Sequence, residues 1–361
     1  MAIDKLTVEE FSVFRKKTEI EFSPGINIFI GENATGKTHL MKLVYSILSS
    51  VHARQKNGAS DNAQLSLTLK DKLAGVFVPA EKEVGRLVTR RTGRHSTKVV
   101  LKRQGTQSLT FRLTTLGNLT VEESDFAEVA PAIFLPSREA LAMYEGFIAA
   151  YDQRELSFDE TYYDLCKFLS AKPLKGPRMR DIRPLLDALE SILGGGVTLE
   201  GGRFYVRRPG DGGGNLEAHL LAEGHRKLAS IVYLITTGTL MKHSVLFWDE
   251  PEANLNPKLT LTVVQALRTM AQRGVQVFIA THDYLITQEL ALHDDYEVEP
   301  MVPQKFFAFT RDPKTGYVSI DSAERLAELK HNAILQEFAA HYDREQRLFS
   351  STGAAPKTGG K

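Results

Sequence analysis

The chain has 361 residues, a formal net charge of +1 and 42% hydrophobic side chains. This length and apolar content allow a large buried core and exclude a disordered chain, and the near-neutral charge excludes a surface that attracts polyanions everywhere. The charged start MAIDKLTVEE is unlike a signal peptide and the longest uncharged stretch, 228–241, is too short to cross a bilayer, so we expect a cytoplasmic protein with no membrane partner.

A motif that binds phosphates follows the first strands. The opening residues alternate apolar and polar side chains and turn at Pro24 and Gly25, and 26–30 then reads as a buried strand. Residues 31–38, GENATGKT, have P-loop spacing, in which backbone N–H groups surround phosphates, the lysine reaches the β- and γ-phosphates and the threonine coordinates Mg²⁺. An amphipathic helix, THLMKLVYSILSS, follows. The expected nucleotide-binding residues are Gly31, Asn33, Ala34, Thr35, Gly36, Lys37 and Thr38.

The next segment, 64–136, contains short alternating runs (LSLTL, GRLVTR, KVVLKR, LTFRLTT) that predict an antiparallel meander. Between Val84 and Val121 it carries eight basic side chains and no acidic one. Such charge is typical of a surface that contacts a nucleic-acid backbone, but a protein-partner surface or a merely solvated face also fits. The eight are Arg86, Arg90, Arg91, Arg94, Lys98, Lys102, Arg103 and Arg112.

From 137 to 196 the spacing becomes helical, which predicts a helical lobe ended by three glycines. The single cysteine, Cys166, lies there in YYDLCKFL, where helical spacing favours core packing over a nucleophilic role and no internal disulfide is possible.

The last half reads as α/β wound on a mostly parallel sheet. The strand SVLFWDE ends in Asp249, a second Mg²⁺ ligand, and in Glu250, which can polarise an attacking water, so the pair predicts hydrolysis. The strand QVFIATHD ends in His282, placed like a sensor of the γ-phosphate. In LAEGHRKLAS a glycine opens a helix whose first N–H groups can meet an anion.

This order of motifs resembles the ABC-type ATPase superfamily, and within it the SMC and RecF-like proteins and the compact AAA-labelled ATPases related to the OLD (overcoming lysogenization defect) family. The resemblance covers residues 1 to about 345. It implies an α/β fold, an ABC-type P-loop ATPase core with a β-meander lobe and a helical lobe, that uses ATP and Mg²⁺. It also implies Asp249 as metal ligand with Thr38, Glu250 as base, His282 as switch, and Asn254 to Asn256 as D-loop.

The resemblance further implies a homodimer or higher oligomer, in which the signature residues of one subunit meet the nucleotide of another. These residues are Ala222, Glu223, Gly224 and His225. The family's signature usually begins with serine, so Ala222 lacks the hydroxyl contact, and backbone N–H groups with Arg226 or Lys227 nearby would have to replace it. The family's Q-loop glutamine has no match, although LPSREAL, with Ser137 and Arg138, occupies about the right region.

The expected organisation has five segments. Because 79 residues (361 − 282) follow His282, we expect no nuclease domain after the ATPase core, so any nuclease or toxin would be a separate protein. The segments are an N-terminal ATPase lobe (1–63), the basic β-meander (64–136), the helical lobe (137–196), a C-terminal ATPase lobe (197–345) and a disordered tail (346–361).

Four functions compete. The leading hypothesis is a Mg²⁺-dependent ATP hydrolase that acts as a dimerising switch or clamp and controls a separate effector, which family analogy places in anti-phage defence. The first alternative is a RecF-like DNA-repair ATPase acting directly on DNA. A transporter's nucleotide-binding subunit is disfavoured by the RecF-like opening and by Ala222, and a scaffold that binds ATP without turnover is disfavoured by Glu250.

Overall fold

A six-stranded sheet forms the centre of the molecule, in the order β14-β13-β3-β12-β11-β7. The computed structural model describes residues 2–56, 61–103, 105–126, 129–207, 214–297 and 299–352. All neighbouring strands of this sheet are parallel except β13 and β14. The strands are β3 (Ile26–Gly31), β7 (Ala132–Leu135), β11 (Val245–Asp249), β12 (Gln276–Thr281), β13 (Gln304–Arg311) and β14 (Val318–Ala323).

Strands β3 and β12 are buried along their whole length, as parallel strands covered on both faces are. Ile30 of β3 pairs with Thr281 of β12, and Ala280 of β12 pairs with Asp249 of β11. Because the strands are parallel, their carboxyl ends lie at one edge of the sheet. The P-loop, Asp249 and the residues after Thr281 therefore share this edge.

A second sheet is antiparallel, in the order β2-β1-β4-β5-β6. It packs with two helices, α1 (Lys37–Lys56) and α2 (Asn62–Phe77), and with one face of the central sheet into a single apolar core. Since β1 pairs with both β2 and β4, the meander belongs to the same sheet as the start of the chain and is not a separate lobe. The strands are β1 (Ile3–Glu9), β2 (Thr18–Glu21), β4 (Ser96–Arg103), β5 (Gln107–Thr114) and β6 (Leu119–Ser124).

The meander prediction is correct for KVVLKR and LTFRLTT, which form β4 and β5, but wrong for the first two runs. LSLTL lies inside α2, where Leu65, Leu69, Leu73 and Val76 recur at helical spacing and are buried. GRLVTR forms the short 3-10 turn η2 (Val84–Leu87), which follows a similar turn, η1 (Ala80–Lys82).

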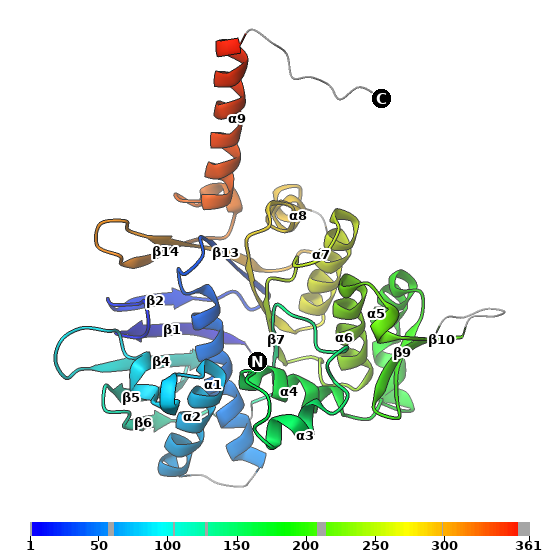
Figure 1. The fold of residues 1–361 in the computed structure, drawn as a ribbon, viewed down its shortest axis with the longest axis horizontal. Coiled ribbons are helices and arrows are strands. Elements are labelled where there is room, and N and C mark those ends of the chain that lie inside the picture. Colours follow the sequence, from blue (N-terminus) through cyan, green and yellow to red (C-terminus); the bar gives the residue numbers. More distant parts are fainter. Residues whose placement is uncertain are drawn as a thin grey trace.

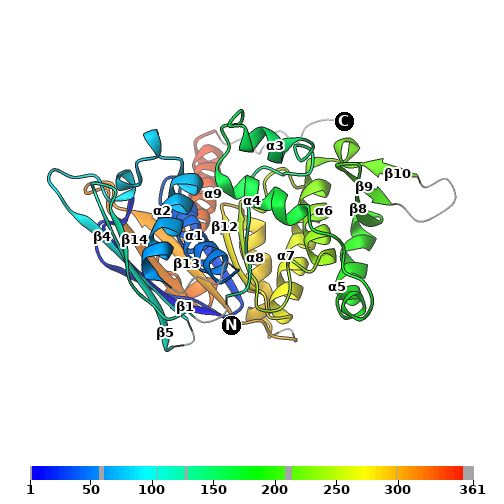
Figure 2. The ribbon, with the colours of Figure 1, turned by 90° about the horizontal axis from the view of Figure 1, so that it is seen from below.

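The opposite face of the central sheet is covered by four helices, which form a second core with side chains of β3, β11 and β12. The antiparallel sheet and α5 lie at opposite ends of the body (Figures 1 and 2). A small sheet of β8 (Gly196–Glu200), β9 (Arg203–Arg207) and β10 (Asn215–Glu217) lies beside α5 and leads through η3 (Ala218–Leu220) to α6. The helices are α5 (Pro177–Leu193), α6 (Glu223–Thr236), α7 (Pro257–Gln272) and α8 (Tyr284–Asp295).

The predicted helical lobe contains α3 (Phe147–Asp152) and α4 (Glu160–Leu169) as well as α5. Cys166 of α4 is fully buried with Phe147 and Tyr162, and burial raises the pKa of its thiol to about 12. The prediction that Cys166 packs in the core is confirmed. No helix in the described part of the chain is long and apolar enough to cross a membrane.

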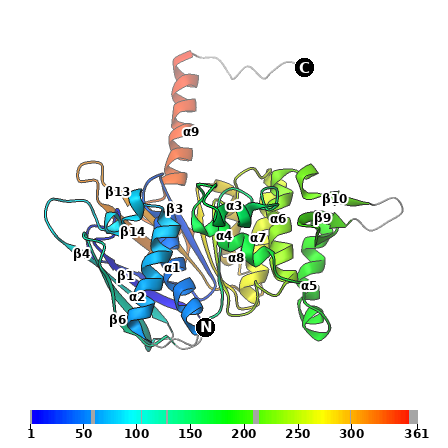
Figure 3. The ribbon, with the colours of Figure 1, turned by 60° about the horizontal axis from the view of Figure 1, so that its bottom comes forward.

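The last helix, α9 (Ala333–Thr352), follows the turn η4 (Leu326–Glu328) and stands away from the body (Figures 1 and 3). The prediction of a disordered tail over 346–361 is therefore wrong for residues 346–352, which continue the helix. Residues 353–361 lie outside the described part of the chain.

Candidate active site

The P-loop connects the buried strand β3 to the start of α1 at Lys37. Gly36 has a φ of +93°, and a Cβ there would lie 2.6 Å from Val13 Cγ2, so only glycine allows the loop to pack on the turn between β1 and β2. Ala34 also has a positive φ, of 60°. This strand, loop and helix order confirms the predicted context of the motif, and it leaves the first N–H groups of α1 without partners inside the helix.

Lys37 is buried under the loop that it follows. Its Nζ donates hydrogen bonds to the carbonyl oxygens of Gly31 (2.7 Å) and Glu32 (2.9 Å). Burial lowers the pKa of Lys37 to about 8, although nearby carboxylates, first that of Asp249, favour the charged form. A cation already removed from water attracts an anion more strongly than a solvated one, so this ammonium is suited to a phosphate oxygen.

Thr38 and Asp249 face each other at the carboxyl edge of the sheet. The Thr38 hydroxyl lies 2.9 Å from Asp249 Oδ1 and 3.1 Å from Oδ2. Burial raises the pKa of Asp249 to about 6, and the hydrogen bond from Thr38 opposes that rise. A hydroxyl and a carboxylate are the hard oxygen ligands that Mg²⁺ prefers. In the described ranges no three or more His, Cys, Asp or Glu side chains are placed to hold a metal ion together, so phosphates and water would supply the other ligands.

Glu250 and His282 lie on the neighbouring strand ends. His282 Nε2 is 3.8 Å from Glu250 Oε1. Burial, followed by the charge of Lys37, lowers the pKa of His282, which keeps its imidazole neutral at neutral pH. Glu250 has a φ of +48°, and its N–H is bound to the Ala280 carbonyl oxygen at 2.9 Å. A non-glycine residue held in the left-handed region at a strand end is typical of functional sites.

These groups line one cavity of about 300 Å³. A second cavity, of about 450 Å³, adjoins it, because Val13 and His39 line both. The second cavity is rich in arginine, so guanidinium groups lie beside the cavity that holds the predicted phosphate-binding groups. The arginines are Arg15, Arg86, Arg90 and Arg311.

The predicted signature residues start α6 and do not line the cavity of their own subunit. Ala222 is exposed at the N-cap, with no side-chain hydrogen bond to the helix. A Cβ on Gly224 would lie 2.6 Å from Leu255 Cδ2, so the helix packs closely on the loop after β11. Asn254 Nδ2 donates to Glu223 Oε1 at 2.8 Å and joins the predicted D-loop to the signature helix.

Three other residues from the sequence analysis have polar partners inside their own subunit. Asn256 is the N-cap of α7, and its side chain accepts from the Leu259 N–H at 2.9 Å. Arg226 binds Glu139 Oε1 at 2.7 Å, and Lys227 Nζ binds the carbonyl oxygen of Ala253 at 2.8 Å. Both cations are therefore bound inside their own subunit, and their contact with the phosphate of a second copy stays a prediction.

The segment LPSREAL follows β7, beside β11 and at the same edge of the sheet. It contains no glutamine, and the contact that its side chains make with α6 comes from Glu139, through Arg226. Ser137 and Arg138 are thus near the place expected of a Q-loop, while the residue after them makes the polar link to the signature helix.

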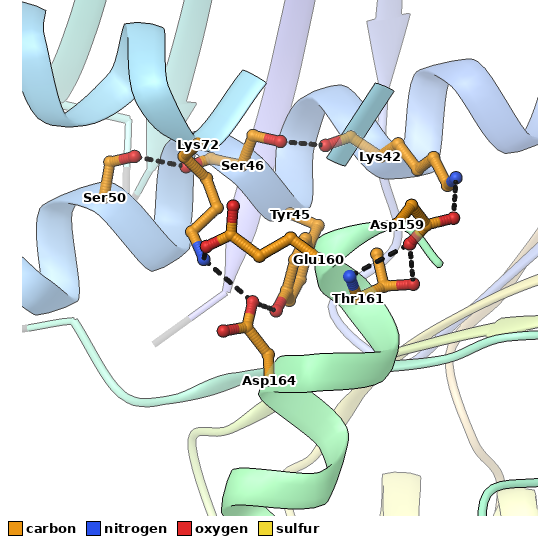
Figure 4. Close-up of polar contacts among 9 residues, drawn as sticks. All are labelled: Lys42, Tyr45, Ser46, Ser50, Lys72, Asp159, Glu160, Thr161 and Asp164. Carbon is orange, nitrogen blue, oxygen red and sulfur yellow. Dashed lines mark hydrogen bonds and ion pairs between the residues drawn. The ribbon is translucent and has the colours of Figure 1, made fainter. Parts of the chain in front are cut away.

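The helical lobe is fastened to the P-loop helix by half-buried ion pairs (Figure 4). Lys42 of α1 lies 2.7 Å from Asp159, the N-cap of α4, and Lys72 of α2 lies 2.8 Å from Asp164 of α4. Tyr45 of α1 also donates to Asp164. Because α1 begins at the P-loop, these contacts fix the helical lobe relative to the phosphate-binding end of the molecule.

Several cations of the basic run 84–121 have acidic side chains beside them in the structure, although the run itself contains no acidic residue. Arg91 forms an ion pair with Glu10, and Arg112 forms one with Glu122. Lys98 lies opposite Glu9 across the β1–β4 pair. Arg103 is buried, and Lys102 lines a groove that also holds Glu9 and Glu19. The run therefore splits into cations with nearby acids and exposed cations that form no ion pair with any residue the structure describes, which are Arg86, Arg90 and Arg94.

Sequence reasoning missed Glu252. Its Oε1 accepts the backbone N–H of His282 at 2.9 Å, whereas its Oε2 is buried without a hydrogen-bond partner. Burial raises the pKa of this carboxyl. The Glu252 side chain therefore fixes the backbone at His282. The available signal was the third acid in WDEPEANLNP, which the charged pair before it obscured.

The comparisons with known proteins agree with this geometry. Residues 1–124 match a family described as "AAA ATPase domain", and residues 135–287 match one described as "AAA domain, putative AbiEii toxin, Type IV TA system". A segment of 45 residues is 49% identical to the DNA replication and repair protein RecF of Lactobacillus acidophilus, over 12% of each chain. Another of 85 residues is 27% identical to the glutamine transport ATP-binding protein GlnQ of Bacillus subtilis, over 22% of this chain and 35% of that one.

The fold matches solved SMC head domains over most of the chain. The head domain from Thermotoga maritima superposes with a TM-score of 0.51 at 14% identity, over 90% of this chain and 99% of that one. An SMC head bound to the C-winged helix domain of ScpA gives a TM-score of 0.52 at 14% identity, over 90% and 98%. The fold is therefore the ABC-type P-loop ATPase fold of SMC heads. The chain is a P-loop ATPase, two parts of which match AAA domain families and short segments of which resemble RecF and the ATP-binding protein GlnQ.

The pKa of Asp249 predicts pH-dependent metal binding. Since Mg²⁺ must displace a proton held with a pKa of about 6, affinity for Mg²⁺ should fall about tenfold per pH unit below pH 6. Titration of Mg²⁺-dependent ATP binding between pH 5 and 8 measures this. Because the folded-state pKa lies above the ordinary value of 3.8, ionisation of Asp249 destabilises the fold as pH rises from 3.8 to about 6. Asp249→Asn should thus raise the Tm at pH 7 and abolish the Mg²⁺ dependence of ATP binding. An affinity for Mg²⁺ that does not change between pH 5 and pH 7 would contradict the assignment of Asp249 as a metal ligand.

Glu252 predicts a separation between two substitutions. Glu252→Gln keeps an oxygen that accepts the His282 N–H and should retain most of the ATPase kcat. Glu252→Ala releases the switch loop and should lower kcat by about tenfold or more through misplacement of His282. The KM for ATP should change little in both, because Glu252 does not line the cavity. Equal loss in the two variants would mean that the charge, and not the hydrogen bond, matters.

Proposed function

We propose that this ATPase is a nucleotide-driven dimerising switch or clamp that controls a separate effector protein, a nuclease or toxin, in anti-phage defence. The observation that supports the dimer is the start of α6, where Ala222 is exposed, no side chain caps the helix and no residue lines the cavity of its own subunit. In this proposal it closes over the nucleotide bound by a second copy. Its backbone N–H groups meet the γ-phosphate without the serine hydroxyl that Ala222 lacks.

The chemistry follows from the residues at the strand ends. Lys37 and the first N–H groups of α1 would bind the phosphates, and Thr38 and Asp249 would hold Mg²⁺, which would supply positive charge against the phosphate groups. Glu250 accepts a proton from the water that attacks the γ-phosphorus, the bond from that phosphorus to the β–γ bridging oxygen breaks, and ADP leaves. His282, neutral and 3.8 Å from Glu250, lies where it orients that water and senses the γ-phosphate. The sugar and base extend toward the arginine-lined cavity.

The effector and the defence role rest on the comparisons. The match over 135–287 to a family described with a toxin of a toxin–antitoxin system supports a place in defence. An SMC head of this fold is bound to a winged-helix domain of ScpA, which supports a protein partner. We also propose that the chain belongs with the compact ATPases related to the OLD family. The matched curated relatives are covered over only 12% and 35% of their lengths, so their own functions do not decide this one.

A direct role on DNA is the second candidate. The RecF segment that is 49% identical and the exposed Arg86, Arg90 and Arg94 favour it. Strong stimulation of ATP turnover by DNA without any partner protein would select this function over the switch.

Substitution of the base tests the switch. Glu250→Gln should keep ATP binding, lower kcat by about a hundredfold or more and accumulate as an ATP-dependent dimer, because the closed state is no longer consumed. Lys37→Ala is the matched control and should neither bind ATP nor dimerise. Light scattering with ATP and Mg²⁺ measures the mass. A Glu250→Gln protein that stays monomeric would refute the composite site, and one that hydrolyses ATP like wild type would refute the base.

Charge reversal separates the two parts of the basic run. Arg86→Glu with Arg90→Glu should raise the KM for ATP, since both side chains line the cavity that adjoins the P-loop. Lys98→Glu with Lys102→Glu, both in β4 of the antiparallel sheet, should leave that KM unchanged. DNA affinity measured against salt for the same variants tests the alternative function, because loss of phosphate contacts flattens the salt dependence. An unchanged KM in the arginine variant would show that the nucleotide does not reach the second cavity.

A further inference from the structure

Helix α9 is the one described helix whose side chains are exposed along most of its length. From Leu335 to Ser351 none of its residues is buried. It runs for 20 residues, so it extends about 30 Å at 1.5 Å per residue. Its first turn is anchored by Asn332, whose side chain accepts the N–H groups of Ile334 (3.1 Å) and Leu335 (3.2 Å).

The exposed helix is amphipathic. Four large apolar side chains recur at spacings of three, four and seven residues and form one stripe, with exposed fractions of 56% for Phe338, 60% for Tyr342 and 53% for Phe349. The first member of the stripe is Leu335. The opposite face is polar and includes Arg344, which pairs with Glu337 at 2.8 Å. A solvated helix gains nothing from such a stripe, since helices in proteins are stabilised mainly by burial of an apolar face.

The position of α9 indicates what covers the stripe. The helix rises from the end of the body at which α1 begins (Figures 1 and 3). At its base the Phe338 ring packs on Tyr284, with ring centroids 4.4 Å apart. Tyr284 is the first residue of α8, two residues after His282. The stripe therefore starts beside the switch loop and continues outward from the nucleotide-binding end.

We propose that the apolar stripe of α9 binds the body of a second copy of this chain. The argument rests on the proposed composite site. A second copy that closes over the nucleotide must approach the end of the body from which α9 extends, and α9 then lies along the side of that copy. A two-fold axis makes the contact reciprocal, so each copy is held by the α9 of the other. The stripe that the single copy leaves in solvent is buried in this dimer.

The experiment places equal charge on the two faces of α9. One variant carries Tyr342→Glu and Phe349→Glu on the stripe, and its matched control carries Gln336→Glu and Ser351→Glu on the polar face. Both are made in the Glu250→Gln protein, and the dimer dissociation constant is measured by sedimentation equilibrium with ATP and Mg²⁺. The stripe variant should raise this constant by at least about tenfold, as loss of buried aromatic anchors does, and the control should leave it within about twofold. Unchanged ATP affinity in both shows that the body is folded.

A photo-crosslinking residue at Tyr342 identifies the occupant directly. Cross-linked peptides from the body of a second copy support the inference. Cross-links confined to the same chain or to an unrelated protein overturn it, as does a stripe variant that dimerises like its control. If that happens while Glu250→Gln still forms an ATP-dependent dimer, the inference fails and the proposed function stands. If no version dimerises and Tyr342 captures no second copy, both fail.

Discussion

The parallel pairing of β3, β12 and β11 is the constraint on which the rest of the site depends. Strand β3 lies more than 200 residues before β11 and β12, and the three end at one sheet edge because Ile30 pairs with Thr281 and Ala280 pairs with Asp249. A shift of one residue would turn each strand's side chains to the other face, and both faces are packed in large apolar cores. The burial of phenylalanines on one face and isoleucines on the other therefore fixes the catalytic register, although none of those side chains touches the cavity.

Most of the site was predictable from sequence because its motifs are local. A glycine-rich loop between a strand and a helix, and an acid pair after an apolar strand, carry their own structural context, and the structure brings Lys37, Thr38, Asp249, Glu250 and His282 together around one cavity. The errors arose where distant residues decide. Leu65, Leu67 and Leu69 alternate like a strand, but Leu73 and Val76 extend the pattern that a helix buries under β6. Likewise, no local pattern could show that Glu10 and Glu122 lie against the basic run.

In the structure described here the charges of the site have partners that a nucleotide would replace. Lys37 is held by carbonyl oxygens of its own loop, and Asp249 is held by the Thr38 hydroxyl. These contacts keep buried charges hydrogen-bonded, and leaving such groups unpaired would cost several kcal/mol. Phosphate and Mg²⁺ offer stronger charge-assisted contacts to the same atoms. Binding is then an exchange of partners inside a preformed site, which needs little movement of the backbone.

Helix α6, which begins with the predicted signature residues, is held tightly against the loop that follows β11. Lys227 of α6 is buried and binds the carbonyl oxygens of Glu250 (3.3 Å) and Ala253 (2.8 Å), while Gly224 leaves no space between the helix and Leu255. The same loop holds the switch strand through Glu252. Because these contacts are close and buried, α6 cannot shift without moving the peptide of Glu250. A second copy that binds at the start of α6 and displaces this helix would therefore also move the backbone of Glu250, through the two hydrogen bonds of Lys227. These contacts can couple the start of α6 to the nucleotide cavity of the same subunit, although the two do not touch.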